Sequence, residues 1–86
     1  MYEIIYHKRV VKFINSRDIK DKKRIKKRFD KLKENPYPSN MEIDIKKLQN
    51  KVGFRLRVGD YRFIYEVEDE KLIIYMEEAD NRGDIY

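Results

Sequence analysis

Cysteine and tryptophan are absent from this 86-residue chain, and histidine occurs once, as His7. Without cysteine, neither a disulfide framework nor a cysteine-ligated zinc can stabilise the fold. The single histidine excludes a multi-histidine metal site, and we expect it to be structural. The longest apolar run, Leu72–Met76, is too short to span a membrane. No positive segment precedes an apolar stretch at the N-terminus, so we expect no signal peptide and a cytoplasmic location.

Charged residues are abundant, at 43% of the sequence, and hydrophobic residues make up 41%. Disorder is the competing interpretation of so much charge, but the apolar residues occur in periodic segments and can form a core. Abundant charge with one glutamine and no cysteine is typical of proteins from hot-growing organisms. The length fits one domain, residues 1–86, because domains average about 150 residues.

The charge is unevenly distributed along the chain. Residues 1–57 hold 18 basic and 7 acidic residues, a net charge of +11, whereas residues 58–86 hold 3 basic and 9 acidic residues, a net charge of −6. Such a gradient favours a polyanionic partner, usually nucleic acid, for the N-terminal part. A well-solvated helix on a heat-resistant protein is the competing explanation.

The N-terminal half predicts one strand and two helices. Tyr2–Tyr6 is β-prone and apolar, and Lys8–Asn15 carries apolar residues three to four positions apart, which suits a short helix. Ser16 and Asp18 are N-cap candidates for a second helix over Ile19–Lys33. The narrow apolar stripe of that helix consists of Ile25, Phe29 and Leu32. The lysines predicted on its opposite, solvent-facing side are Lys20, Lys23 and Lys27.

The C-terminal half predicts strands. A short irregular strand lies within Met41–Leu48, and strictly alternating strands follow. The expected order is strand Phe54–Val58, a two-residue type II′ turn at Gly59-Asp60, strand Tyr61–Glu68, a turn at Asp69-Glu70, and strand Lys71–Glu77. The predicted fold is therefore α+β in the order β-α-α-β-β-β, an antiparallel sheet with a two-helix hairpin packed on one face.

The predicted hairpin registers place like charges together. If Gly59-Asp60 is the loop, Arg57 faces Arg62 and Arg55 lies two positions along the same face. If Asp69-Glu70 is the next loop, Glu77 faces Arg62. Opposed arginines repel by up to roughly 1 kcal/mol, so the pattern favours a phosphate-binding role, for which the guanidinium fork is suited. Alternatively, Glu77 simply neutralises the pair.

The run Gly53–Tyr65, GFRLRVGDYRFIY, resembles the signature of the RelE/ParE toxin superfamily. Its features are a basic alternating strand, a Gly-Asp-Tyr-Arg turn and an apolar strand. The resemblance covers essentially the whole chain. It includes the opening strand, the two helices, the proline loop, and an Arg82 that shortly precedes the terminal Tyr86. The resemblance implies a single RelE-like toxin domain with a microbial-ribonuclease-type fold.

RelE-type members of the superfamily are ribosome-dependent endoribonucleases that cut mRNA in the ribosomal A site. The resemblance implies attack by the RNA 2′-hydroxyl, no metal and no cofactor. It also implies three kinds of partner: a cognate RelB-like acidic antitoxin, the ribosome and mRNA. The catalytic residues that it implies are Arg55, Arg57, Arg62, Arg82 and Tyr86.

The general base stays open between two groups. The resemblance implies Tyr86. Neighbouring arginines would favour the phenolate form of its side chain. The sequence departs from its relatives by carrying carboxylates before Arg82, and Glu77 or Glu78 could serve as the base instead. Once the resemblance is allowed, Lys20, Lys23 and Lys27 become candidate contacts for ribosomal RNA phosphates.

Two other functions remain in competition. ParE-type toxins share the fold and much of the Gly-Asp-Tyr-Arg region but inhibit DNA gyrase. Arg55 and Arg57 together with Arg82 and Tyr86 favour the nuclease branch. A catalytically silent module that only binds RNA or antitoxin is the third interpretation, because the acidic residues could oppose RNA phosphates.

Overall fold

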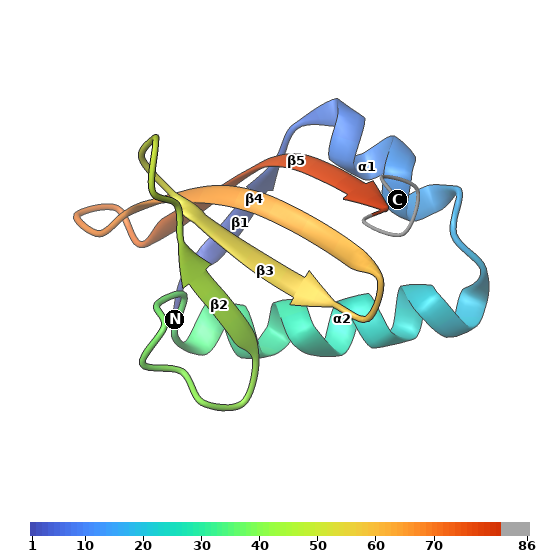
Figure 1. Ribbon diagram of the computed structural model, residues 1–86, viewed down its shortest axis with the longest axis horizontal. Coiled ribbons are helices and arrows are strands. Elements are labelled where there is room, and N and C mark those ends of the chain that lie inside the picture. The colour runs from blue at the N-terminus through green and yellow to red at the C-terminus, as the bar shows by residue number, and fades with distance from the viewer. Residues whose placement is uncertain (82–86) are drawn as a thin grey trace.

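The computed structural model describes residues 1–81, in which two helices pack on a five-stranded sheet (Figure 1). The elements, in chain order, are β1 (Glu3–Tyr6), α1 (Lys8–Asn15), α2 (Ile19–Glu34), β2 (Asp44–Lys47), β3 (Phe54–Val58), β4 (Tyr61–Glu68) and β5 (Ile73–Asn81). The α+β class and the placement of both helices ahead of the main strands are confirmed. The predicted short irregular strand is present as β2.

The strands follow the order β1-β5-β4-β3-β2 across the sheet. The prediction of antiparallel pairing holds from β2 to β5, but β1 pairs parallel with β5. The sheet is therefore mixed. A parallel pair needs a long connection between its strands, and the helices and remaining strands between β1 and β5 supply it.

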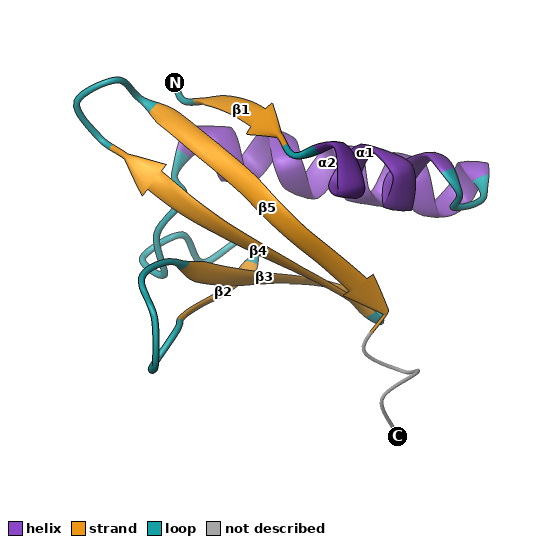
Figure 2. Cartoon of the chain, turned by 90° about the horizontal axis from the view of Figure 1, so that it is seen from above, coloured by secondary structure: helices purple, strands orange, loops and turns teal. Residues whose placement is uncertain are grey.

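Both helices lie on the same side of the sheet, where α1 contacts β5 and α2 contacts β3 (Figure 2). His7 caps α1 by accepting the Arg9 backbone N–H, which supports a structural role for this histidine. Asp18 caps α2 as predicted, by accepting the Asp21 N–H at 2.8 Å, whereas Ser16 closes the end of α1.

Within residues 1–81, no helix is both long and apolar enough to cross a membrane.

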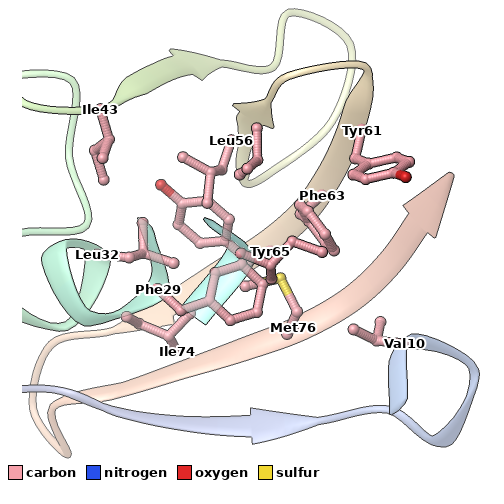
Figure 3. Packing of buried hydrophobic residues seen from close by; sticks show 12 residues of the cluster. Val10, Phe29, Leu32, Ile43, Leu56, Tyr61, Phe63, Tyr65, Ile74 and Met76 are labelled. Carbon is pink, nitrogen blue, oxygen red and sulfur yellow. The ribbon is translucent and has the colours of Figure 1, made fainter. Parts of the chain in front are cut away.

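The core between helices and sheet combines aliphatic side chains with the aromatic rings of Phe29, Tyr61, Phe63 and Tyr65 (Figure 3). The predicted stripe of α2 is buried there, and its Phe29 packs edge-on against Phe63 of β4, with ring centroids 5.0 Å apart. Tyr65 is fully buried and donates its hydroxyl to the Pro36 carbonyl at 2.6 Å, so its polar end is satisfied. The core therefore fixes the inner face of β4, and the outer face of the strand is left to carry functional side chains.

The β3–β4 hairpin has the predicted register. Gly59 adopts a positive φ of 58° and Asp60 does not, which is the pattern of a type II′ turn. Arg57 consequently faces Arg62, and Arg55 faces Ile64. The opposition of two arginines, inferred from the turn residues, is thus confirmed.

The β4–β5 register was predicted incorrectly. The loop between these strands spans Asp69–Leu72 rather than two residues, and Leu72 adopts a left-handed φ of 55°. A bulge next to Ile64 and Tyr65 shifts the pairing further. Arg62 therefore faces Asp80, not Glu77. The strand also extends to Asn81, beyond the predicted end at Glu77.

Candidate functional site

Three arginines lie on the sheet face that points away from the helices. Leu56 and Val58 of β3 point into the core, so the alternation of the strand sends Arg55 and Arg57 to the opposite face. Arg62 joins them from β4, directly across from Arg57. We call Arg55, Arg57 and Arg62 the arginine face.

Two aspartates from neighbouring strands hold this face together. Asp80 of β5 accepts two bonds from Arg62, from Nη2 at 2.9 Å and from Nε at 3.3 Å. Asp44 of β2 lies 3.4 Å from Arg55 Nη2 and 4.0 Å from Arg57 Nε. The alternative in which Glu77 neutralises the arginine pair is wrong, because Asp80 is the carboxylate that faces and pairs with Arg62. Three cations against two anions leave the cluster positive.

The arginines differ in accessibility. The side chain of Arg55 is 13% exposed, whereas those of Arg57 and Arg62 are 38% and 35% exposed. Arg55 Nη1 and Arg57 Nε are buried and have no hydrogen-bond partner within residues 1–81. Unsatisfied buried donors typically cost about 1–3 kcal/mol, and such groups are often found where a ligand completes the network.

A hollow of about 230 Å³ opens beside the arginine face. Its lining includes the apolar Ile64, which is buried although it points away from the core. The remaining lining residues are Lys46, Lys47, Leu48, Gln49, Arg55 and Arg62. A small hollow lined by both cationic and apolar side chains suits a phosphate with an adjoining sugar or base.

The two candidate carboxylate bases lie on β5 at the bulge. Glu78 pairs across the sheet with Ile64, and its carboxylate lies 3.2 Å from Lys51 Nζ. Partial burial and the neighbouring Glu66 carboxylate raise the pKa of Glu77 above the usual range of a glutamate. A carboxylate with a raised pKa is a stronger proton acceptor than an ordinary one, so Glu77 keeps its candidacy on chemical grounds.

The remaining predicted residues are placed as follows. Lys20, Lys23 and Lys27 are exposed on α2, as the periodicity predicted. Arg82 and Tyr86 lie outside the described residues. Among residues 1–81, no group of three or more histidine, aspartate or glutamate side chains could hold a metal ion.

Sequence reasoning did not pair either Asp44 or Asp80 with the arginine face, although it counted Asp80 among the carboxylates that could oppose RNA phosphates. Asp44 lies between Ile43 and Ile45, which pack toward the core, so simple alternation could have placed it outward next to β3. The pairing of Asp80 could not be read in this way, because it depends on the loop length and on the bulge in β5.

Residues 2–77 match the family model described as the ParE toxin of the type II toxin–antitoxin system parDE. That match covers most of the chain. The chain belongs to the RelE/ParE family of type II toxins. Its arginine face is formed by the same segment, Gly53–Tyr65, that carries the resemblance in the sequence.

Solved structures of RelE–RelB complexes are similar to this RelE/ParE chain over almost its full length. The archaeal RelE–RelB complex from Pyrococcus horikoshii matches with 32% identity and a TM-score of 0.80, covering 95% of this chain and 96% of the other. The RelB–RelE complex from Methanococcus jannaschii matches with 26% identity and a TM-score of 0.74, covering 95% and 94%.

A more distant relative agrees in fold. The intact RelBE complex of E. coli matches with 21% identity and a TM-score of 0.77, covering 94% of this chain and 96% of the other. Among curated proteins, no sequence matches this chain. By fold, the chain is thus a RelE-like toxin of a type II toxin–antitoxin system.

Proposed function

We propose that this toxin is a metal-independent endoribonuclease that cleaves mRNA in the ribosomal A site. The observation that carries the proposal is the arginine face, where Arg55, Arg57 and Arg62 project from the same side of the paired strands β3 and β4. Guanidinium groups around one phosphate stabilise the negative charge that develops on a pentavalent phosphorane. Arg57 and Arg62 repel each other in the absence of an anion, so a phosphate would be favoured between them.

The proposed reaction is an internal transfer at one phosphodiester. The 2′-oxygen forms a bond to phosphorus while the bond from phosphorus to the 5′-oxygen breaks, leaving a 2′,3′-cyclic phosphate and a 5′-hydroxyl. One group must take the 2′-hydroxyl proton, and another must give a proton to the 5′-oxygen. Tyr86 is our first candidate for the base, and Glu77 or Glu78 is the alternative. Arg82 would add a further cation.

Dependence on the ribosome has a physical rationale in this set of residues. Arginine is a weak proton donor because its pKa exceeds about 12. Cleavage should therefore be slow unless the RNA is held in the attack geometry, which an A site could supply. The exposed Lys20, Lys23 and Lys27 of α2 would contact ribosomal RNA phosphates and position the protein without reading sequence.

We also propose a cognate acidic antitoxin as the partner that neutralises the toxin in the cytoplasm. The similar structures from P. horikoshii and M. jannaschii are complexes of RelE with RelB. A net charge of +11 over residues 1–57 suits an acidic, extended partner that orders on binding. Such a RelB-like chain would cover the arginine face or displace the segment that carries Arg82 and Tyr86.

The second candidate function is inhibition of DNA gyrase. The family model that matches residues 2–77 is described as a ParE toxin, and this match favours the gyrase branch. A silent binding module is the third possibility, since Asp80 and Asp44 already occupy the arginines.

One experiment separates the three functions. Purified toxin is added to a translation reaction on a reporter mRNA and, in parallel, to a gyrase supercoiling assay. The proposal predicts mRNA cuts at codon spacing that require ribosomes and end in a 2′,3′-cyclic phosphate, with supercoiling unaffected. Loss of supercoiling without mRNA cleavage would identify the gyrase branch, and neither effect would identify a binding module.

A further inference from the structure

Asp80 pairs with the guanidinium edge of Arg62, formed by Nε and Nη2, to which a phosphate would bind. The two carboxylate oxygens accept from Nη2 at 2.9 Å and from Nε at 3.3 Å, which is a two-pronged pair along one edge of the guanidinium. A phosphate binds arginine through two oxygens along such an edge. Carboxylate and phosphate therefore compete for the same two donors.

Asp44 makes a weaker arrangement on the other side of the face. Its contacts with Arg55 and Arg57 are 3.4 Å and 4.0 Å long, and its carboxylate is shared between them. The pair between Asp80 and Arg62 is shorter and involves two bonds. Of the two aspartates, Asp80 is thus the stronger competitor for an incoming phosphate.

The position of Asp80 follows from the bulge in β5. Register without the bulge would not place an acid opposite Arg62, whereas the observed register pairs Arg62 with Asp80 directly across the strands. Asp80 is about half exposed, at 45%, so its carboxylate can turn to solvent when an anion replaces it.

We infer that Asp80 is a specificity-determining residue, a carboxylate that holds the phosphate-binding edge of Arg62 until an RNA phosphate fixed by other contacts displaces it. The inference rests on the proposed function, because it takes the arginine face as the place where the RNA backbone binds. A loosely held RNA must break the Asp80 pair at a cost in affinity. RNA that a larger assembly holds in place loses less entropy on binding, so its phosphate displaces Asp80 more readily.

The test measures RNA binding, which does not depend on cleavage. A fluorescent single-stranded RNA with 2′-O-methyl groups throughout serves as an uncleavable probe, and its anisotropy gives the dissociation constant. Asp80→Asn is compared with Glu70→Gln, which changes net charge equally at the β4–β5 turn, beyond the opposite end of β4. Arg62→Ala and the double variant Asp80→Asn/Arg62→Ala complete a cycle.

The expected result is that Asp80→Asn tightens RNA binding about fivefold more than Glu70→Gln does. This gain should vanish in the Arg62→Ala background, because the competitor then has no guanidinium to occupy. Asp80→Glu keeps the charge and should bind RNA as the wild type does. Circular dichroism checks that each variant is folded.

Equal effects of Asp80→Asn and Glu70→Gln would overturn the inference, because general charge would then explain the change. Weaker binding by Asp80→Asn would also overturn it, since Asp80 would then support the site. A gain that persists without Arg62 would do the same. The proposed function fails separately, if the wild-type toxin produces no ribosome-dependent cuts while the coupling between Asp80 and Arg62 is still observed.

Discussion

At the residue scale, Arg57 and Arg62 place two positive charges directly opposite each other in the sheet. Like charges directly opposite each other destabilise a sheet by up to roughly 1 kcal/mol. Asp80 and Asp44 relieve part of this repulsion, yet Arg55 Nη1 and Arg57 Nε remain buried without hydrogen-bond partners among residues 1–81. The arginine face lowers the stability of the folded protein and is suited to bind an anion, which is the pattern expected of a functional site that acts on phosphate.

The identity of the general base is tested by removing each proton acceptor in turn. Tyr86→Phe should abolish cleavage on ribosomes and leave ribosome binding unchanged, because it removes only the hydroxyl. Glu77→Gln should stay active, because Tyr86 takes the proton in this account, although burial and Glu66 raise the pKa of Glu77. Rates from primer extension and sedimentation binding measure both effects. An inactive Glu77→Gln or Glu78→Gln variant beside an active Tyr86→Phe variant would assign the base to the carboxylate.

At the element scale, turn chemistry determines how much could be predicted from the sequence. Gly59-Asp60 defines a two-residue turn, so the opposition of Arg57 and Arg62 followed from counting positions. The next turn lacks glycine and uses Leu72 in a left-handed conformation, which leucine rarely adopts, so its length was not evident. The partner of Arg62 was mispredicted for that reason and because the bulge in β5 shifts the pairing by one further position. The direction of β1 depends on tertiary pairing with β5, which the periodicity of the sequence does not encode.

Two glycines that flank β3 should respond differently to alanine. At Gly53, with φ of 119°, a Cβ would lie 2.6 Å from the Tyr65 carbonyl oxygen, which is fixed backbone. At Gly59, with φ of 58°, the Cβ would meet the guanidinium of Arg24 at 2.9–3.0 Å, which is a movable side chain. We expect Gly59→Ala to cost about 1–2 kcal/mol and Gly53→Ala about 3 kcal/mol or more. Urea unfolding midpoints measure both, and a Gly59→Ala variant less stable than Gly53→Ala would contradict this account.

At the scale of the whole molecule, one exposed carboxylate links segments that are distant in the sequence. Asp69, in the β4–β5 loop, accepts the hydroxyls of Tyr2, just before β1, and Tyr37, in the proline loop, each at 2.6 Å. These hydrogen bonds hold the pKa of Asp69 below its usual range. The end of the sheet farthest from the β3–β4 turn is thereby tied to both the N-terminus and the segment after α2.

The Asp69 cluster predicts a defined acid response. Because the pKa of Asp69 is lower in the folded than in the unfolded chain, its stabilisation is present above the unfolded value of 3.8 and is lost as pH falls through the folded value. Asp69→Asn should therefore be less stable than the wild type at neutral pH, and the difference should shrink below about pH 4. Thermal unfolding from pH 7 to pH 2 measures this, with Glu70→Gln as the neighbouring control. A difference independent of pH would contradict the assigned cause.

The central claim is that the arginine face stabilises the transition state of RNA cleavage. Its most direct test is the single-turnover cleavage rate of mRNA on programmed ribosomes, measured at saturating toxin so that weaker binding does not enter. Arg62→Ala is compared with the wild type and with Arg62→Lys, which keeps the charge but not the planar fork. The account predicts a folded Arg62→Ala variant whose rate is lower by about 10²–10³-fold, with Arg62→Lys restoring only part of it. A rate for Arg62→Ala within about threefold of the wild type would contradict it, because the loss of a transition-state contact should lower the rate far more than that.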